Sequence, residues 1–67
     1  MATVARITEI SATSDVSFED AIQSGVSRAQ ATLRNVRSAW IKEQEVQVGD
    51  GGSLSYKVNM LITFILD

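Results

Sequence analysis

The sequence contains no cysteine and no histidine, and aromatic residues make up only 6% of it. Without cysteine there is no disulfide, and without cysteine or histidine the usual ligands of zinc, haem and iron–sulfur clusters are missing. The same absences remove thiol nucleophiles and imidazole bases, which leaves carboxylates, hydroxyls, lysine and tyrosine for chemistry. We therefore expect a binding protein and not an enzyme.

The charges are mixed in sign. Six lysine and arginine residues are set against eight aspartate and glutamate residues, which gives a net charge of −2 and a pI near 4.9. Clustered basic charge, as nucleic-acid binding requires, is absent. No apolar run approaches the roughly 18 residues of a membrane helix, and no basic and then apolar leader follows Met1. We expect a cytoplasmic protein with no nucleic-acid or membrane partner.

The chain is short, with 67 residues and a mass of 7.3 kDa, so we expect a single domain over residues 1–67. Surface-area scaling implies that a monomer of this size buries only about 60% of its unfolded surface. No disulfide or zinc site can compensate for such a thin core. We therefore expect the folded chain to be stabilised by self-association.

The first half of the chain predicts a strand, a loop and a helix. β-Branched residues favour a strand over Thr3–Ile10, and small polar residues favour a loop over Ser11–Asp15. Ser17 and Asp20 have the spacing of a capping box, which predicts the start of a helix. Gly25 lies in the apolar stripe of this helix and predicts a close approach of another segment. The stripe spans about five turns and comprises Phe18, Ala21, Ile22, Val26, Ala29, Leu33 and Val36.

The second half predicts two strands joined by a hairpin. Ser38–Val48 mixes apolar with charged residues, which is typical of a mostly solvated strand. Gly49–Gly52 supplies residues that readily adopt positive φ, as a tight turn requires. The last segment, Leu54–Asp67, alternates strictly between two faces. Its wholly apolar face comprises Leu54, Tyr56, Val58, Met60, Ile62, Phe64 and Leu66.

The element order is therefore β-α-β-β, which predicts an α+β fold with one helix across a face of a three-stranded antiparallel sheet. The sequence leaves the strand order open. Leu61 and Ile65 make the end of the last strand apolar on both faces, so a bare sheet would be prone to aggregate. We expect copies of the same chain to cover it in a closed assembly.

Three stretches together carry a resemblance to a known family: the polar loop in Ile10–Ser14, the helix from Phe18 to Val36, and the strand from Tyr56 to Leu66. In these stretches, in length and in element order, the chain resembles the dodecins. The resemblance implies a three-stranded sheet partly wrapped around one helix, and a hollow homododecamer. It also implies non-catalytic sequestration of flavin, as riboflavin or FMN, at subunit contacts.

Two positions differ from the flavin-binding pattern of that family. Dodecins that bind flavin carry a Trp at the start of the second strand, where an ungapped comparison places Ser38. Trp40 is two residues further on, so strand alternation places it on the same face, about 7 Å along the strand. Lys57 replaces a Gln that hydrogen-bonds the flavin; lysine donates to a carbonyl but cannot accept from a ring N–H. Gln44 is expected on the same face as Ser38 and Trp40, and these four residues form the candidate cofactor-binding set.

Two interpretations remain open for the neighbouring residues. Trp40 either stacks on a flavin or fills a contact between subunits, where Trp is enriched. Glu43 and Glu45, expected on the face opposite Trp40, are either solvated or bind a divalent cation such as calcium where copies converge. The leading hypothesis is a flavin-binding homododecamer. The alternative is a dodecin-fold shell that has lost flavin and holds a cation or another small ligand.

Overall fold

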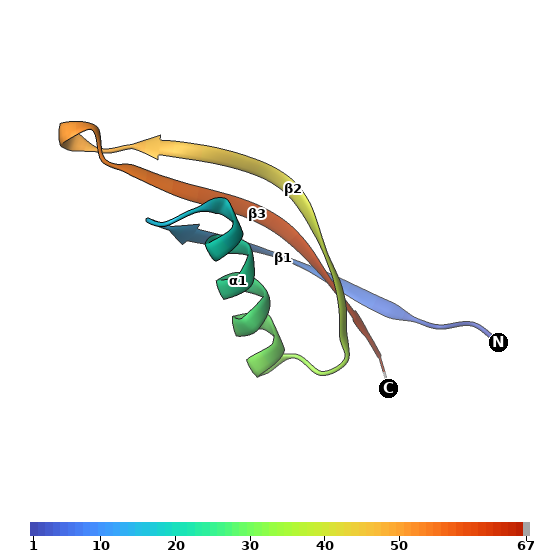
Figure 1. Ribbon diagram of the computed structural model, residues 1–67. Helices are drawn as coiled ribbons and strands as arrows, with labels where there is room; N and C mark the ends of the chain where they lie inside the picture. Colours follow the sequence, from blue (N-terminus) through green and yellow to red (C-terminus); the bar gives the residue numbers. More distant parts are fainter. Residues whose placement is uncertain (67) are drawn as a thin grey trace.

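The computed structural model describes residues 1–66 and contains a helix and three strands (Figure 1). The strands are β1 (Ala5–Ser14), β2 (Val36–Val48) and β3 (Leu54–Ile65), and the helix is α1 (Phe18–Thr32). The predicted β-α-β-β order and α+β class are confirmed. The face predicted for Asp67 lies outside the described residues. Over residues 1–66, no helix is long and apolar enough to cross a membrane.

The strands form one antiparallel sheet in the order β1-β3-β2. The most hydrophobic strand, β3, is therefore the one paired on both sides. The first two strands of the sequence are not neighbours and occupy the two edges of the sheet. α1 lies across one face, and β2 and β3 curve past it (Figure 1). Within residues 1–66 of the single chain, both backbone edges of the sheet are left without a strand partner.

The core lies between α1 and the sheet face that it covers. Gly25 is buried there, and a Cβ at this position would collide with the end of the Met60 side chain and approach the Cβ of Ala12 to 3.2 Å. The predicted close approach at Gly25 is thus confirmed. The buried hydrophobic residues alternate along β3 and recur at helical spacing on α1; they are Val58, Met60, Ile62, Ala21 and Ala29.

The first strand is longer than predicted. Ser11–Ser14, expected to form a loop, continues β1 and pairs residue by residue with the segment from Tyr56 to Asn59 of β3. The expectation rested on the local turn preference of small polar residues. Here the ladder hydrogen bonds to the central strand outweigh that preference, because β-strand formation depends strongly on its partners.

The predicted start of the helix is correct, but the capping box is only half formed. The Ser17 hydroxyl accepts a hydrogen bond from the backbone N–H of Asp20 at 2.9 Å, as expected of an N-cap. The Asp20 carboxylate does not reach back to Ser17. Instead it accepts a 2.6 Å hydrogen bond from the hydroxyl of Ser14, which is nearly buried at the end of β1. An aspartate is one methylene shorter than the glutamate of a full capping box, which accounts for the difference.

The helix ends earlier than predicted. Leu33 is already extended, with φ −114° and ψ 146°, and its N–H closes the helix on the carbonyl of Ala29. Asn35 then adopts a positive φ of 61°, a conformation that asparagine tolerates better than most residues. Its carbonyl accepts a hydrogen bond from the N–H of Ile65 at 3.0 Å. The chain thus turns directly into β2, and Val36 belongs to the strand and not to the helix.

The hairpin between β2 and β3 projects beyond the rest of the molecule. Gly51 and Gly52 have φ values of 78° and 82°, which confirms the prediction of positive φ in this turn. The 3-10 turn Asp50–Gly52 is closed by the N–H of Gly49, which donates to the carbonyl of Ser53 at 2.7 Å. The chain is elongated, with principal extents of 55 × 20 × 13 Å, and the hairpin projects at one end and the N-terminal segment at the other (Figure 1).

Candidate ligand-binding face

In the part of the chain that the structure describes, α1 covers one face of the sheet and no helix or strand covers the other. Residues that pair across an antiparallel sheet share a face, and Val58, Met60 and Ile62 are buried under the helix. The intervening residues of β3 therefore point to the other side, which we call the open face. Its contribution from β3 consists of Ser55, Lys57, Asn59, Leu61, Thr63 and Ile65.

Trp40 and Ser38 both lie on the open face. Trp40 pairs with Leu61, and Ser38 pairs with Thr63, so the prediction that the two share a face is confirmed. The Trp40 residue is 65% exposed, and it lies on the edge strand β2. Ile7 of β1, which pairs with Thr63 from the other side, is also exposed on this face. An indole of this size left in solvent on an apolar surface is typical of a contact or binding site.

A β-bulge changes the positions of the residues that follow. The register of β2 against β3 shifts between Ile41 and Glu43, and the alternation is reversed beyond that point. Gln44 pairs with Val58 and therefore lies on the helix side, so its predicted place beside Ser38 and Trp40 is wrong. The strict alternation assumed for the strand fails because one residue is inserted.

The same bulge brings two carboxylates to the open face. Glu43 pairs with Asn59 and Glu45 pairs with Lys57, so both lie on the face of Trp40 and not, as predicted, on the opposite one. The Asn59 amide nitrogen donates to Glu43 Oε1 at 3.0 Å, and Lys57 Nζ lies 3.5 Å from Glu45 Oε1. Both carboxylates thus already have a partner on β3.

The open face is therefore divided into an apolar end and a polar middle. A shallow hollow of about 150 Å³ lies in the polar part and is lined by Glu43, Glu45, Lys57 and Asn59, with Gln44 contributing from between the two glutamates although it pairs on the helix side. Across β3, Lys42 Nζ lies 3.4 Å from Glu9 Oε1. Within residues 1–66, no group of three or more acidic, histidine or cysteine side chains could hold a metal ion. A cation in this hollow would have to compete with the ammonium group of Lys57.

Trp40 and Lys57 are not close to each other within one chain. Their positions on β3 correspond to Leu61 and Lys57, which are separated by about 13 Å at the rise of a β-strand. A ligand that contacts both residues must span this distance, or must bind in a site to which another copy of the chain contributes one of them. The structure therefore brings Ser38 and Trp40 together and places Lys57 apart from them, on the same face.

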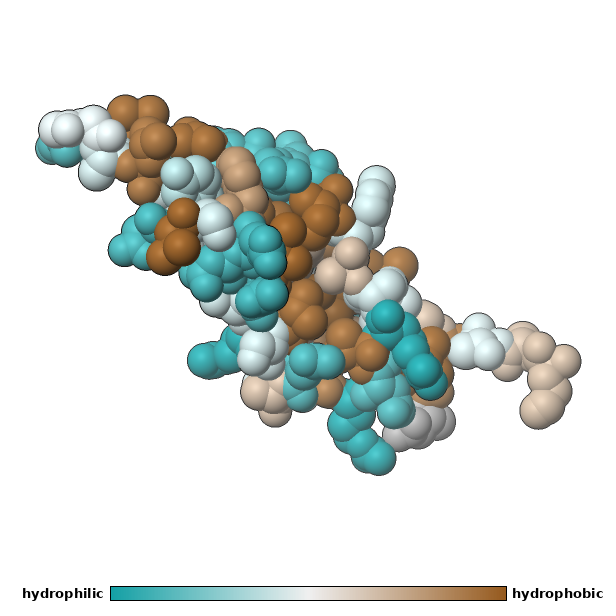
Figure 2. Space-filling model, viewed as in Figure 1, coloured by the Kyte–Doolittle hydropathy of each residue, from teal (hydrophilic) through white to brown (hydrophobic). Residues whose placement is uncertain are grey.

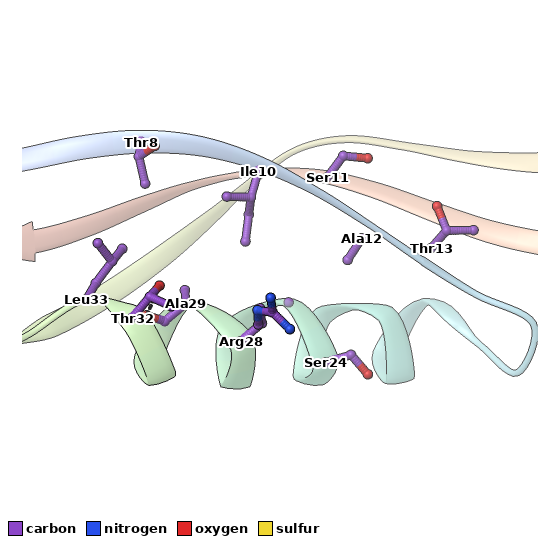
Figure 3. Close-up of a pocket in the computed structure, with 11 residues that line it drawn as sticks. Thr8, Ile10, Ser11, Ala12, Thr13, Ser24, Arg28, Ala29, Thr32 and Leu33 are labelled. Atoms are coloured by element: carbon purple, nitrogen blue, oxygen red, sulfur yellow. Dashed lines mark hydrogen bonds between the residues drawn. The ribbon is translucent and has the colours of Figure 1, made fainter.

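A second concavity lies on the other side of the sheet, between α1 and β1. This α1–β1 groove has a volume of about 520 Å³. Ile10 and Ala12 of β1 and Ala29 and Leu33 near the end of the helix form its apolar lining, and Figure 3 shows these side chains between the two elements. Of residues 1–66, Arg28 is the one charged residue that lines it.

The family model for Dodecin matches residues 4–67. The chain belongs to the dodecin family. Among curated relatives, this dodecin is 30% identical over 61 residues to the calcium dodecin of Mycobacterium tuberculosis. The aligned residues make up 91% of this chain and 86% of the relative. The resemblance suggested by the sequence is thus confirmed.

Solved dodecin structures share the fold of this chain closely. A mutant of the Thermus thermophilus dodecin superposes with a TM-score of 0.90 at 32% identity, covering 98% of both chains. The dodecin from Streptomyces davaonensis gives a TM-score of 0.89 at 34% identity, covering 97% of this chain and 96% of that one. The structure of the M. tuberculosis calcium dodecin, described as having a novel calcium-binding site, gives 0.87 at 28% identity, covering 96% and 91%.

Proposed function

We propose that this dodecin binds flavin without catalysing a reaction, and that it sequesters FMN or riboflavin at subunit contacts of a homododecamer. The observation that carries the proposal is the exposed indole of Trp40 on the open face, beside the unpaired edge of β2. Stacking of a planar ring on such an indole contributes about 1–3 kcal/mol. A second copy that approaches the β2 edge would cover the other side of the ring and exclude water.

The neighbouring residues have separate roles in this proposal. Ser38 lies on the same face as Trp40, on the strand that carries the indole, and its hydroxyl can donate to or accept from the ring edge. Lys57 contributes to a flavin only when a second copy completes the site, or through the extended side chain and phosphate of FMN. Gln44 is not part of this site, because it faces the helix side of the sheet.

The test is a fluorescence titration of FMN and of riboflavin with purified protein. Stacking on Trp40 quenches flavin emission, so we expect saturable quenching at micromolar protein. The Trp40→Ala variant should lose it, whereas Trp40→Phe, which keeps an aromatic ring, should retain part of it. Absence of quenching by the wild-type protein, or unchanged quenching by an assembled Trp40→Ala variant, would contradict the proposal.

A divalent cation such as calcium is the second candidate ligand. The specific observation in its favour is that Glu43 and Glu45 lie on the same open face, where carboxylates of several copies can converge. The name of the M. tuberculosis relative is consistent with it. Against it, Asn59 and Lys57 already occupy these carboxylates, so a cation requires them to rearrange.

Thermal unfolding in calcium and in chelator distinguishes this candidate from flavin binding. A cation that binds only the native protein raises its melting temperature. If calcium is the ligand, we expect this rise in melting temperature to disappear in the Glu43→Gln/Glu45→Gln variant. The control Glu9→Gln removes a carboxylate elsewhere on the open face and should keep the rise. A melting temperature that neither calcium nor chelator changes would exclude calcium.

A further inference from the structure

No segment of the described residues 1–66 covers the helix side of the outer part of the β2–β3 hairpin. α1 begins at Phe18, whose ring contacts Tyr56 edge-on with centroids 5.1 Å apart, and β1 ends at Ser14, which pairs with Tyr56. Beyond this level, β2 and β3 are the only strands among the described residues. We call the outer hairpin from Val46 to Tyr56, which is two-stranded beyond the Val46–Tyr56 pair, the arm; Figure 1 shows it projecting past the start of α1.

The helix side of the arm is apolar and exposed. Val46 pairs with Tyr56 and Val48 pairs with Leu54, so these side chains continue the face that α1 covers elsewhere. Val46, Val48 and Leu54 are 43%, 74% and 45% exposed. Figure 2 shows this apolar surface next to the polar tip of the hairpin. A two-stranded ribbon in water is only marginally stable, so an arm of this kind requires a partner.

The chain as a whole exposes more surface than a compact chain of its mass. The accessible surface of the chain is 4861 Å², whereas a compact monomer of 7.3 kDa is expected to expose about 4,200 Å². The excess of roughly 700 Å² is close to the ~800 Å² that each partner buries in a standard interface. The chain therefore exposes more surface than a compact monomer of its mass, as its elongated shape requires, and the exposed apolar side chains of the arm are part of that surface.

We infer that the arm of one copy docks into the α1–β1 groove of a second copy. The groove is apolar at its floor, as the arm is on its helix side, and it lies beside the unpaired edge of β1. The charges also match: Asp50 is the one charged residue of the 49–53 tip, and among the described residues Arg28 is the one charged residue lining the groove. This inference rests on the self-assembly proposed above, and it names the arm and the α1–β1 groove as the two surfaces that meet between copies.

The contact cannot form within one chain. The arm extends past the first residue of α1, whereas Arg28 and Thr32 lie ten or more residues along the helix from Phe18, or at least about 15 Å at the rise of an α-helix. Because arm and groove are different surfaces, the contact is head-to-tail. Repetition of such a contact with a suitable rotation closes into a ring.

Engineered cysteines test the contact directly, because the chain has none of its own. A disulfide requires the two Cα atoms to approach to about 4.4–6.8 Å. We expect Val48→Cys combined with Arg28→Cys or with Thr32→Cys to form disulfide-linked ladders on mild oxidation. The matched control carries Gln47→Cys in place of Val48→Cys, which places the thiol on the opposite face of the arm. It should not form ladders with either groove cysteine.

Removal of the apolar contact provides an independent test. We expect Val48→Asp/Leu54→Asp to reduce the assembly to smaller species in native mass spectrometry, with its circular dichroism retained. The control Gln47→Asp/Ser55→Asp, on the other face of the arm, should leave the assembly intact. An assembly that forms without ladders from either cysteine pair, or dimers through Val48→Cys alone, would overturn the inference and leave the flavin proposal standing. A wild-type chain that does not assemble would overturn both.

Discussion

Replacement of Gly25 by alanine tests the packing of the helix on the sheet. In a solvent-exposed helix, this change stabilises by about 1 kcal/mol, because alanine has the higher helix propensity. Here the new Cβ would collide with the terminal methyl group of Met60 and lie 3.2 Å from the Cβ of Ala12. Met60 is fully buried, with 0% of its surface exposed, so its side chain has little free space.

The two effects differ in size. Added volume in a packed core typically costs 1–3 kcal/mol, which outweighs the gain in propensity of about 1 kcal/mol. We expect Gly25→Ala to lower the free energy of unfolding by about 1 kcal/mol. Met60→Leu removes the colliding methyl group at a cost below about 1.5 kcal/mol. In the double variant the collision is absent, so the two substitutions should couple favourably by about 1–2 kcal/mol.

The assay is urea unfolding of the four proteins of this cycle, followed by circular dichroism at one fixed protein concentration. Native mass spectrometry of each protein confirms that all four have the same assembly state before unfolding. If Gly25→Ala stabilises the protein by itself, and its effect adds to that of Met60→Leu without coupling, the close contact described here is not present in solution.

Three further predictions use the same urea assay. Ser17→Ala removes the acceptor of the Asp20 N–H and should lower the free energy of unfolding by about 1 kcal/mol. Ser17→Asp keeps a side-chain acceptor and should retain most of that stabilisation. Equal stability of the two variants would contradict the role of Ser17 as N-cap. Gly51→Ala has no steric obstacle within 4 Å, but φ is 78°, so the backbone alone should cost about 1 kcal/mol; Gly51→Asn should cost less. Glu9→Gln, which breaks an exposed ion pair with Lys42, should change stability by less than about 1 kcal/mol, and a larger loss would show that this pair is buried in the assembly.

Much of the fold could be predicted because local chemistry and long-range packing agree. The alternation of β3, the cap at Ser17 and the glycines of the hairpin turn each have one dominant physical cause, and each was correct. Ser11–Ser14 was misassigned because its local preference for a loop is outweighed by pairing with β3. The end of the helix was misplaced because apolar spacing continues through Leu33 and Val36, although these residues pack on the core from extended backbone.

The candidate site was predicted only in part, and the reason is the bulge near Lys42. Ser38 and Trp40 come before the bulge in the chain, so strand alternation correctly places both on one face. Glu43, Gln44 and Glu45 come after the bulge, and each lies on the face opposite to the one predicted. No glycine or proline marks this position in the sequence, so the insertion depends on how β2 bends along β3 and has no local signal.

In our proposal, a solitary chain is incomplete, and copies of it cover the arm and the open face and form the ligand sites between them. Native mass spectrometry of the protein as purified, diluted to micromolar concentration, tests this most directly. We predict one dominant closed assembly with the mass of a homododecamer, with retained flavin as added mass. A well-folded monomer as the main species at this concentration would contradict the claim.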